Sequence, residues 1–175
     1  MDVRDLAWND FDGWVDLYYG RYEELGGNPD LGVYFFPERP SRAEEVRVFA
    51  EFMKGVLDRD VVAVVAPEGR SLAGICSVHR RGRHLEDRHL GTLGIFVRAD
   101  RRGRGVGDAL LRAALDRCRG LFEIVELRVV ATNPARHLYE RHGFRTFGEQ
   151  PRSFKRGTRY LNDVLMWRPV APAPT

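Results

Sequence analysis

One segment of this 175-residue chain restricts its fold more than any other, the stretch from Leu93 to Gly107. It begins with the apolar residues of a strand, continues as a basic loop containing Gly103 and Gly105, and ends in the first turn of a helix. Glycines let backbone amides turn toward one point, and a helix N-terminus adds unpaired N–H groups and partial positive charge. The segment therefore predicts a phosphate or pyrophosphate site in an α/β domain. The alternative is a basic turn that binds no ligand.

The loop differs from two familiar phosphate-binding motifs. A P-loop requires Lys and then Ser or Thr after its last glycine, and neither follows Gly107. The dinucleotide motif GxGxxG has a different spacing, because here the glycines run GxGxG with Arg104 between the first two. The ligand must be inferred from the rest of the chain.

A second segment, Asn133 to Phe144, contains a turn, a short helix that carries Tyr139, a stop at Gly143 and an aromatic residue that starts a strand. By itself, a tyrosine in such a helix is expected to be a core or rim aromatic. The two segments in this order along one chain are much more specific than either alone.

The rest of the chain alternates between helical and strand periods. We predict helices over 11–25, from the capping box Ser41–Glu44, from about Gly105 and over 135–141. Strands are predicted over 2–7, 61–66, 72–79, 92–97, 122–131, 144–147 and 160–167. Gly94 inside one of them predicts a bulge or a close backbone approach. With neither a repeat nor a linker, the chain is expected to form one α/β domain with a mixed sheet over 1–168, followed by a flexible tail at 169–175.

The chain has 28 Lys and Arg against 25 Asp and Glu, a net charge of +3, and only Lys54 and Lys155 are lysines. The arginine excess indicates either a codon preference or a surface for phosphate and other anions. Because acidic residues are interleaved with the basic ones, we expect surface ion pairs and no nucleic-acid partner.

The longest uncharged apolar run, 61–67, is too short to cross a bilayer, so no membrane association is expected. The first residues lack an apolar signal region, which predicts a cytoplasmic protein. Cys76 and Cys118 show no metal-ligand spacing and are expected to be reduced thiols packed in the core.

The two segments together resemble the general-control-related N-acetyltransferases, the GNAT superfamily. Arg102–Gly107 is similar to the acyl-CoA loop of that family, and Leu138-Tyr139-Glu140 with Gly143-Phe144 is similar to its LYE…GF segment. The resemblance covers roughly residues 72–167. It implies a single-domain GNAT fold, with a mixed central sheet of about six to seven strands flanked by about four helices.

The resemblance also implies an activity, the acetyl-CoA-dependent acetylation of a primary amine on a small molecule or peptide, without a metal, by a monomer or homodimer. Tyr139 would protonate the departing thiolate while the amine attacks directly. The strand at 95–97 would pair with the pantetheine arm and stabilise the oxyanion. The residues implied in acyl-CoA binding are Ile95, Phe96, Val97, Arg102, Gly103, Arg104, Gly105, Val106, Gly107, Thr132 and Asn133. Arg101, Arg102 and Arg104 are candidates for phosphate contacts, and solvated arginines are the alternative.

Some positions depart from the family pattern. Thr132 occupies the usual Asn position, so Asn133 either takes over its role or caps the short helix. Thr92 stands where many relatives have a Glu, which leaves the general base open. The candidates are His84, Glu86, Asp87, His89, Glu126 or a water relay, and a solvated polar loop is the alternative for the first four.

The acceptor side is less defined. The strand from Tyr160 to Met166 resembles the Y-x-D-E-x-x-M strand of small-molecule acetyltransferases, so Asp163 either receives a cationic amine or faces water at a sheet edge. Trp8, Trp14 and the aromatic residues 34–36 either line an acceptor pocket or belong to the core. A GNAT-fold module that binds acyl-CoA as a sensor or is catalytically idle is the alternative function.

Overall fold

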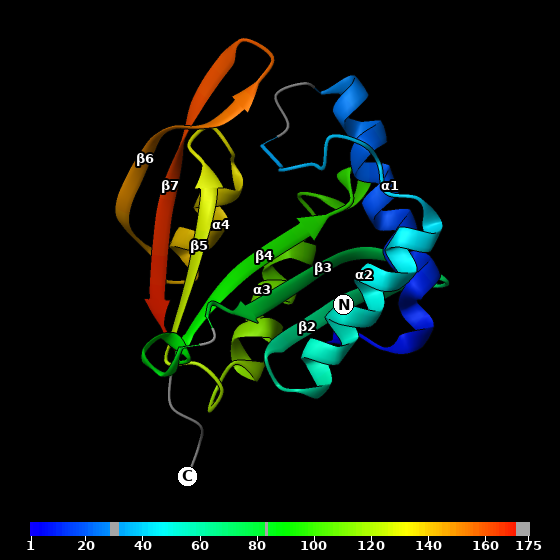
Figure 1. Cartoon of the computed structure of the whole chain (residues 1–175), viewed down its shortest axis with the longest axis horizontal. Helices are drawn as coiled ribbons and strands as arrows, with labels where there is room; N and C mark the ends of the chain where they lie inside the picture. Colours follow the sequence, from blue (N-terminus) through cyan, green and yellow to red (C-terminus); the bar gives the residue numbers. More distant parts are fainter. Residues whose placement is uncertain (29–31, 83, 171–175) are drawn as a thin grey trace.

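The protein folds around one mixed seven-stranded sheet (Figure 1). A computed structural model describes residues 1–28, 32–82 and 84–170. The strand order is β1-β2-β3-β4-β5-β7-β6, and β4 and β5 are parallel while the other neighbours are antiparallel. The strands are β1 (Arg4–Asp5), β2 (Val61–Glu68), β3 (Ser71–Arg80), β4 (Leu90–Val97), β5 (Ile124–Val130), β6 (Arg145–Arg156) and β7 (Arg159–Pro169). The predicted mixed α/β fold is confirmed.

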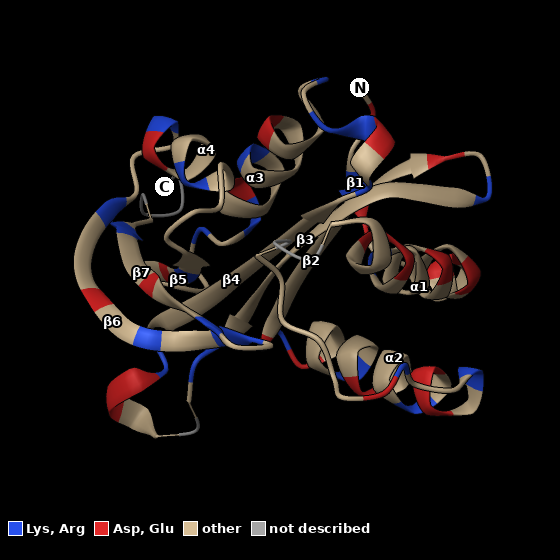
Figure 2. Ribbon diagram, turned by 90° about the horizontal axis from the view of Figure 1, so that it is seen from above, with Lys and Arg blue, Asp and Glu red and all other residues tan. Residues whose placement is uncertain are grey.

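Helices cover both faces of the sheet. Figure 2 shows α3 and α4 on one face and α1 and α2 on the other. Their bounds are α1 (Phe11–Gly27), α2 (Arg42–Leu57), α3 (Val106–Arg117) and α4 (Ala135–Arg141). The predicted capping box begins α2, since the Ser41 amide donates to Glu44 Oε2 (2.7 Å) and Ser41 Oγ accepts from the Glu44 amide (3.3 Å).

The side chains of β2 alternate between two cores. Val62, Val64 and Ala66 pack in the core on the α3 side, whereas Val61, Ala63 and Val65 pack in the core beneath α1 and α2. A strand buried on both faces needs no polar alternation, which explains its continuous apolar sequence. Cys76 and Cys118 are buried free thiols, and their predicted core role is confirmed.

The two parallel strands separate along their length (Figure 1). β4 and β5 pair only from Leu90↔Ile124 to Thr92↔Glu126, while β4 stays paired with β3 as far as Val97. The far edge of β4 is therefore open beyond Thr92. The pairing of β3 with β4 has no register shift, so the predicted bulge at Gly94 is wrong. A Cβ at Gly94 would meet no atom within 4 Å, so the predicted close approach is absent as well.

The end of the chain differs from expectation in its bounds. β6 extends well beyond the predicted 144–147. The sequence does not show this extension, because most of this edge strand is exposed and two register shifts interrupt its pairing with β7. β7 includes Pro169, the first residue of the expected tail, and 171–175 lie outside the described residues. Within 1–28, 32–82 and 84–170, no helix has the length and apolarity needed to span a bilayer.

Candidate functional site

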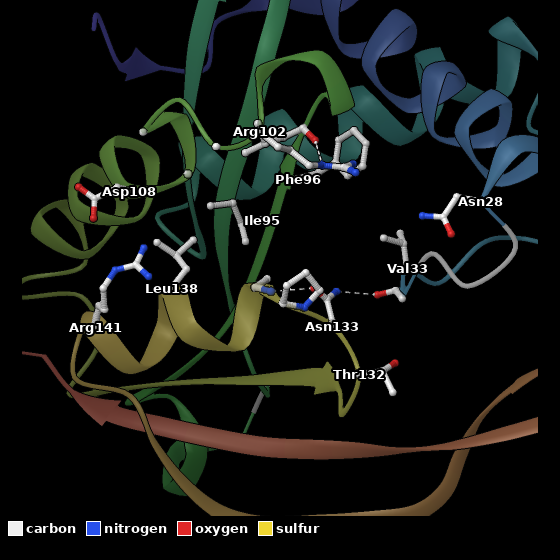
Figure 3. A pocket seen from close by; sticks show the side chains of 17 residues that line it. Asn28, Val33, Ile95, Phe96, Arg102, Asp108, Thr132, Asn133, Leu138 and Arg141 are labelled. Atoms are coloured by element: carbon white, nitrogen blue, oxygen red, sulfur yellow. Dashed lines mark hydrogen bonds between the residues drawn. The ribbon is translucent and has the colours of Figure 1, made fainter.

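A cavity of about 510 Å³ opens where the free edge of β4 meets α3, α4 and the residues after α1 (Figure 3). Figure 3 shows Ile95 and Leu138 facing the cavity from β4 and α4, with Asp108 and Arg141 toward one end and Asn28 and Val33 toward the other. The residues implied in acyl-CoA binding gather here: Ile95, Phe96, Val97, Arg102, Gly103, Gly105, Gly107, Thr132 and Asn133 line the wall. Val106 lies beneath the loop in the core, and Arg104 is exposed beside it.

The glycine-rich loop has the backbone form that its sequence predicts. Gly103 (φ 69°) and Gly105 (φ 82°) adopt left-handed conformations that side chains disfavour. Gly105 is the N-cap of α3, and no side chain caps this end of the helix. The first amides of α3 therefore remain available beside the cavity, with the positive end of the helix dipole behind them. This arrangement suits a phosphate group.

The loop arginines divide into two groups. Arg101 forms ion pairs with Glu68 and Asp100 (both 2.7 Å). Both terminal nitrogens of Arg102 donate to the Glu24 carboxylate of α1, and its Nε donates to the Val97 carbonyl (2.9 Å). Arg104, by contrast, has no ion pair or hydrogen bond within the described residues. Of the three, Arg104 is thus the one available to an anion.

Arg141 was missed by the sequence analysis. It lines the cavity near the end of α4, opposite the start of α3. His142 Nε2 lies 2.8 Å from Asp108 Oδ1, which joins the two helices at this point. Neither the position of Arg141 opposite α3 nor the contact between His142 and Asp108 follows from a sequence motif, because each brings together residues of different helices.

The open part of β4 supplies a second kind of binding surface. Ile95 to Val97 lie beyond the last pair between β4 and β5. Ile95 packs toward the core on the α3 side, and Phe96 packs toward the core beneath α1. An extended, amide-containing ligand can pair with such an edge as an added strand does.

Asn133 performs two structural tasks beside Thr132. Its Oδ1 accepts from the Ala135 amide (2.9 Å) at the start of α4, and its Nδ2 donates to the Gly32 carbonyl (3.2 Å). The helix-capping alternative for Asn133 is therefore observed. The same side chain joins α4 to the segment after α1.

Tyr139 lies behind the cavity wall. It is 7% exposed, belongs to the core on the α3 side and packs against Phe144 with 5.9 Å between ring centroids. Burial raises its pKa well above the usual value, and nearby Cys76 adds to the effect. Its neighbour Leu138 lines the cavity, whereas Tyr139 is not among the lining residues. The phenol therefore stays protonated at neutral pH.

None of the candidate general bases lines the cavity. His84, Glu86, Asp87 and His89 lie in or beside the short helical turn Leu85–Asp87, before the start of β4 and at the opposite end of that strand from Val97. Glu126 lies opposite Thr92, at the point where β4 and β5 separate, and forms an ion pair with Arg81 (3.1 Å). Within the described residues, no group of three or more His, Cys, Asp or Glu side chains could hold a metal ion.

The acceptor-side candidates separate clearly. Trp14 is 1% exposed in the core beneath α1, so the core alternative is confirmed for it, and Trp8 is largely exposed. Asp163 is fully buried on β7 and accepts a hydrogen bond from Tyr34, with Arg128 Nε 3.3 Å from the same oxygen. The alternative in which Asp163 faces water at a sheet edge is therefore wrong.

Comparison with known proteins agrees with the family resemblance seen in the sequence. The sequence of residues 5–144 matches the family described as Acetyltransferase (GNAT) family. No curated protein matches the chain significantly.

Solved structures of similar fold cover nearly all of the chain. A phosphinothricin acetyltransferase from Sinorhizobium meliloti in complex with acetyl-CoA is 24% identical, with a TM-score of 0.79 over 97% of this chain and 88% of that one. yncA from Salmonella typhimurium, with its cofactor acetyl-CoA, is 15% identical, with a TM-score of 0.81 over 99% and 96%. A ribosomal-protein-alanine N-acetyltransferase from Brucella melitensis is 18% identical, with a TM-score of 0.80 over 97% and 99%. At these low identities, it is the TM-scores that show a shared fold.

Proposed function

The chain belongs to the acetyltransferase (GNAT) family, and on that basis we propose that it transfers the acetyl group of acetyl-CoA to a primary amine of a small molecule or peptide. One observation carries the proposal. The same cavity combines an open strand edge with an uncapped helix N-terminus and its glycine loop. A linear ligand with amides at one end and phosphates at the other matches both surfaces.

The chain offers a distinct partner for each part of acetyl-CoA. The amides at Gly103, Gly105 and Gly107 would hold the pyrophosphate, with Arg104 and Arg141 as cationic partners. The edge at Ile95–Val97 would pair with the pantetheine arm. Acetyl-CoA supplies the activated acetyl group, and an N–H of this edge would stabilise negative charge developing on the carbonyl oxygen.

Tyr139 is proposed as the proton donor to the departing thiolate. Its raised pKa keeps the phenol protonated, which a donor requires. The amine proton would leave through water, because no candidate carboxylate or histidine lines the cavity. The acceptor would attack directly, without a covalent enzyme intermediate.

The burial of Tyr139 also favours a second candidate function. A tyrosine that only packs in the core would be compatible with an acyl-CoA sensor that has no catalytic activity. Release of free thiol from acetyl-CoA across a panel of amines and peptide N-termini distinguishes the two functions. Binding of CoA without thiol release from any amine supports the sensor and rejects the enzyme.

The same assay tests Tyr139. We expect Tyr139→Phe to lower kcat at least about tenfold, because it removes the donor hydroxyl, while the Kd for acetyl-CoA changes little. Tyr160→Phe is the matched control, because Tyr160 is exposed on β7 and lies outside the cavity wall. An unchanged kcat in Tyr139→Phe would remove this residue from the mechanism.

A further inference from the structure

Arg21 of α1 is a largely enclosed cation with no anionic partner among the described residues. Its guanidinium lies against the rings of Tyr18, Phe35 and Phe96, at 4.9, 5.5 and 5.1 Å from their centroids. Nη2 donates to the Tyr34 carbonyl (3.0 Å), and Nε is buried without a partner. Within the described parts of the chain, Arg21 forms no ion pair.

Two carboxylates that act electrostatically on Arg21, those of Glu24 and Glu45, are bonded to other donors. Glu24, one turn further along α1, is held by both terminal nitrogens of Arg102. Glu45 is buried and accepts from the Trp14 indole nitrogen (3.2 Å). Neither side chain neutralises Arg21 through a direct contact.

A cation in this setting is unfavourable unless something compensates its charge. Burial lowers the pKa of Arg21, which reports the loss of hydration. Aromatic faces recover part of that loss. A bound anion would recover more, because hydrogen bonds between charged groups are roughly twice as strong as neutral ones.

Arg21 does not itself line the cavity, but it packs against residues that do. Phe96, which it contacts, lines the cavity, and so does Val33, the neighbour of Tyr34. Figure 3 shows Val33 on the side away from Asp108 and Arg141, the end assigned to phosphate. The open edge at Ile95–Val97, where the acyl group would lie, includes Phe96 itself. An acceptor entering beside this edge would contact Phe96 and so come near Arg21.

Further cations surround the same short segment. Arg128 of β5 lies over the Tyr34 ring (4.7 Å), and Arg156 of β6 donates to the Val33 carbonyl (2.8 Å). Asp163 contacts this segment as an acidic group, and its Oδ2 is already shared by Tyr34 and Arg128. Arginines from three elements thus converge on residues 33–35. Such an environment disfavours a polyamine and favours an acceptor that carries negative charge.

We propose that Arg21 is a specificity-determining residue that binds a carboxylate of the acceptor, so that the acceptor is an amino acid. This inference rests on the proposed acetyltransferase function and narrows its substrate class. Arg21 Nη1, which has no hydrogen-bond partner among the described residues, and Nη2, which donates to the Tyr34 carbonyl through one N–H, are the two terminal nitrogens of a planar fork that would bind the carboxylate oxygens. The amino group of the same molecule then lies within reach of the acyl position beside Phe96.

The test compares each amino acid with its own carboxamide as acceptor, by thiol release. We expect the wild-type protein to show a kcat/KM at least about 30-fold higher for the carboxylate form. In Arg21→Gln this ratio falls to about threefold or less, because the amide cannot replace the ionic contact. Arg21→Lys retains part of the preference, since it keeps the charge without the fork. Aminophosphonates of matched structure show whether another oxyanion is preferred.

Controls separate recognition from folding. Arg70→Gln changes an exposed arginine in the β2–β3 turn and should keep the wild-type ratio. The Kd for acetyl-CoA should be unchanged in Arg21→Gln. Equal use of carboxylate and carboxamide by the wild-type protein, or an equal loss for both in Arg21→Gln, overturns the role of Arg21. A preference for aminophosphonates overturns the assignment to amino acids. Absence of thiol release with every amine rejects the proposed function itself.

Discussion

At the scale of single residues, the site depends on a few backbone conformations. Gly105 combines a left-handed φ of 82° with a position at the uncapped start of α3. A Cβ placed there would meet no atom within 4 Å, so the space beside it is open to a ligand. The glycine is needed for conformation and for access rather than for packing.

We expect Gly105→Glu to abolish binding of acetyl-CoA, because it adds bulk and negative charge where the phosphates would lie. Isothermal titration with acetyl-CoA measures the effect. Gly69→Glu is the control for backbone strain, since Gly69 also has a positive φ (62°) and open space in the β2–β3 turn, away from the cavity. A wild-type Kd in Gly105→Glu would show that the loop does not hold phosphate.

The loop arginines show the limit of prediction for a single residue. Arg101, Arg102 and Arg104 are indistinguishable as sequence, because all three are cations beside the same glycines. Their contacts differ because Glu24 and Glu68 come from α1 and β2, far away in the chain. Only the tertiary structure identifies Arg104 as the one without a partner among the described residues.

At the scale of elements, the pairing between Arg102 and Glu24 joins the glycine loop to the end of α1. Glu24 also terminates that helix, since its carbonyl accepts from the Asn28 amide (2.8 Å). The contact therefore joins the glycine loop at the cavity to the last turn of α1. Helix and loop are held as one unit.

Glu24→Gln should weaken this unit. We expect a loss of about 1 kcal/mol in the free energy of unfolding, a modest value because Arg102 is partly exposed. The Kd for acetyl-CoA should rise about threefold, which corresponds to less than 1 kcal/mol. Urea unfolding and calorimetric titration give the two numbers. Glu23→Gln is the control, because Glu23 is exposed and has no ion pair within the described residues. Equal effects of the two changes would contradict the coupling.

Sequence patterns predicted most elements well. The four helices and six of the strands lie close to the ranges expected from their periods, because most of them bury one face or both. β6 is the exception. It is an edge strand with mostly exposed residues, and its pairing with β7 is a long-range contact that leaves little pattern in the sequence.

At the scale of the whole molecule, carboxylates and arginines form a network of contacts across the surface, and Figure 2 shows acidic and basic segments interspersed on the helices. Hydrogen bonds from Arg101, Arg98 and His142 lower the pKa values of Glu68, Asp100 and Asp108. At Asp10, burial alone would raise the pKa, but the bonds from Arg4 and the Ala7 amide lower it.

This network predicts acid sensitivity. A carboxyl group whose pKa is lower in the folded protein stabilises it above the unfolded pKa, and that stability is lost as the pH falls through the folded pKa. We therefore expect the contribution of these carboxyl groups to the free energy of unfolding to be constant from neutral pH to about pH 5 and to fall progressively below it. Urea unfolding between pH 7 and pH 3 measures this.

Asp10→Asn should be less stable at pH 7 and should lose less stability on acidification, because Asp10 is buried and bound by both terminal nitrogens of Arg4 (2.7 Å each). Asp16→Asn is the exposed control. Stability that does not change between pH 7 and pH 3 would contradict the importance of these contacts.

The sequence by itself determined the α/β class, most element positions and the two motifs that place the chain in its family, because periodicity and glycine positions are local properties. It also indicated the residues proposed to bind acyl-CoA, since these lie in two continuous segments. The tertiary structure alone decided what each polar side chain contacts: Glu24 holds Arg102, Asn133 donates to the Gly32 carbonyl, and among the described residues Arg21 meets aromatic faces and one carbonyl. These outcomes depend on distances between residues far apart in the chain. The open edge of β4 has the same origin, because it arises from where β5 turns away.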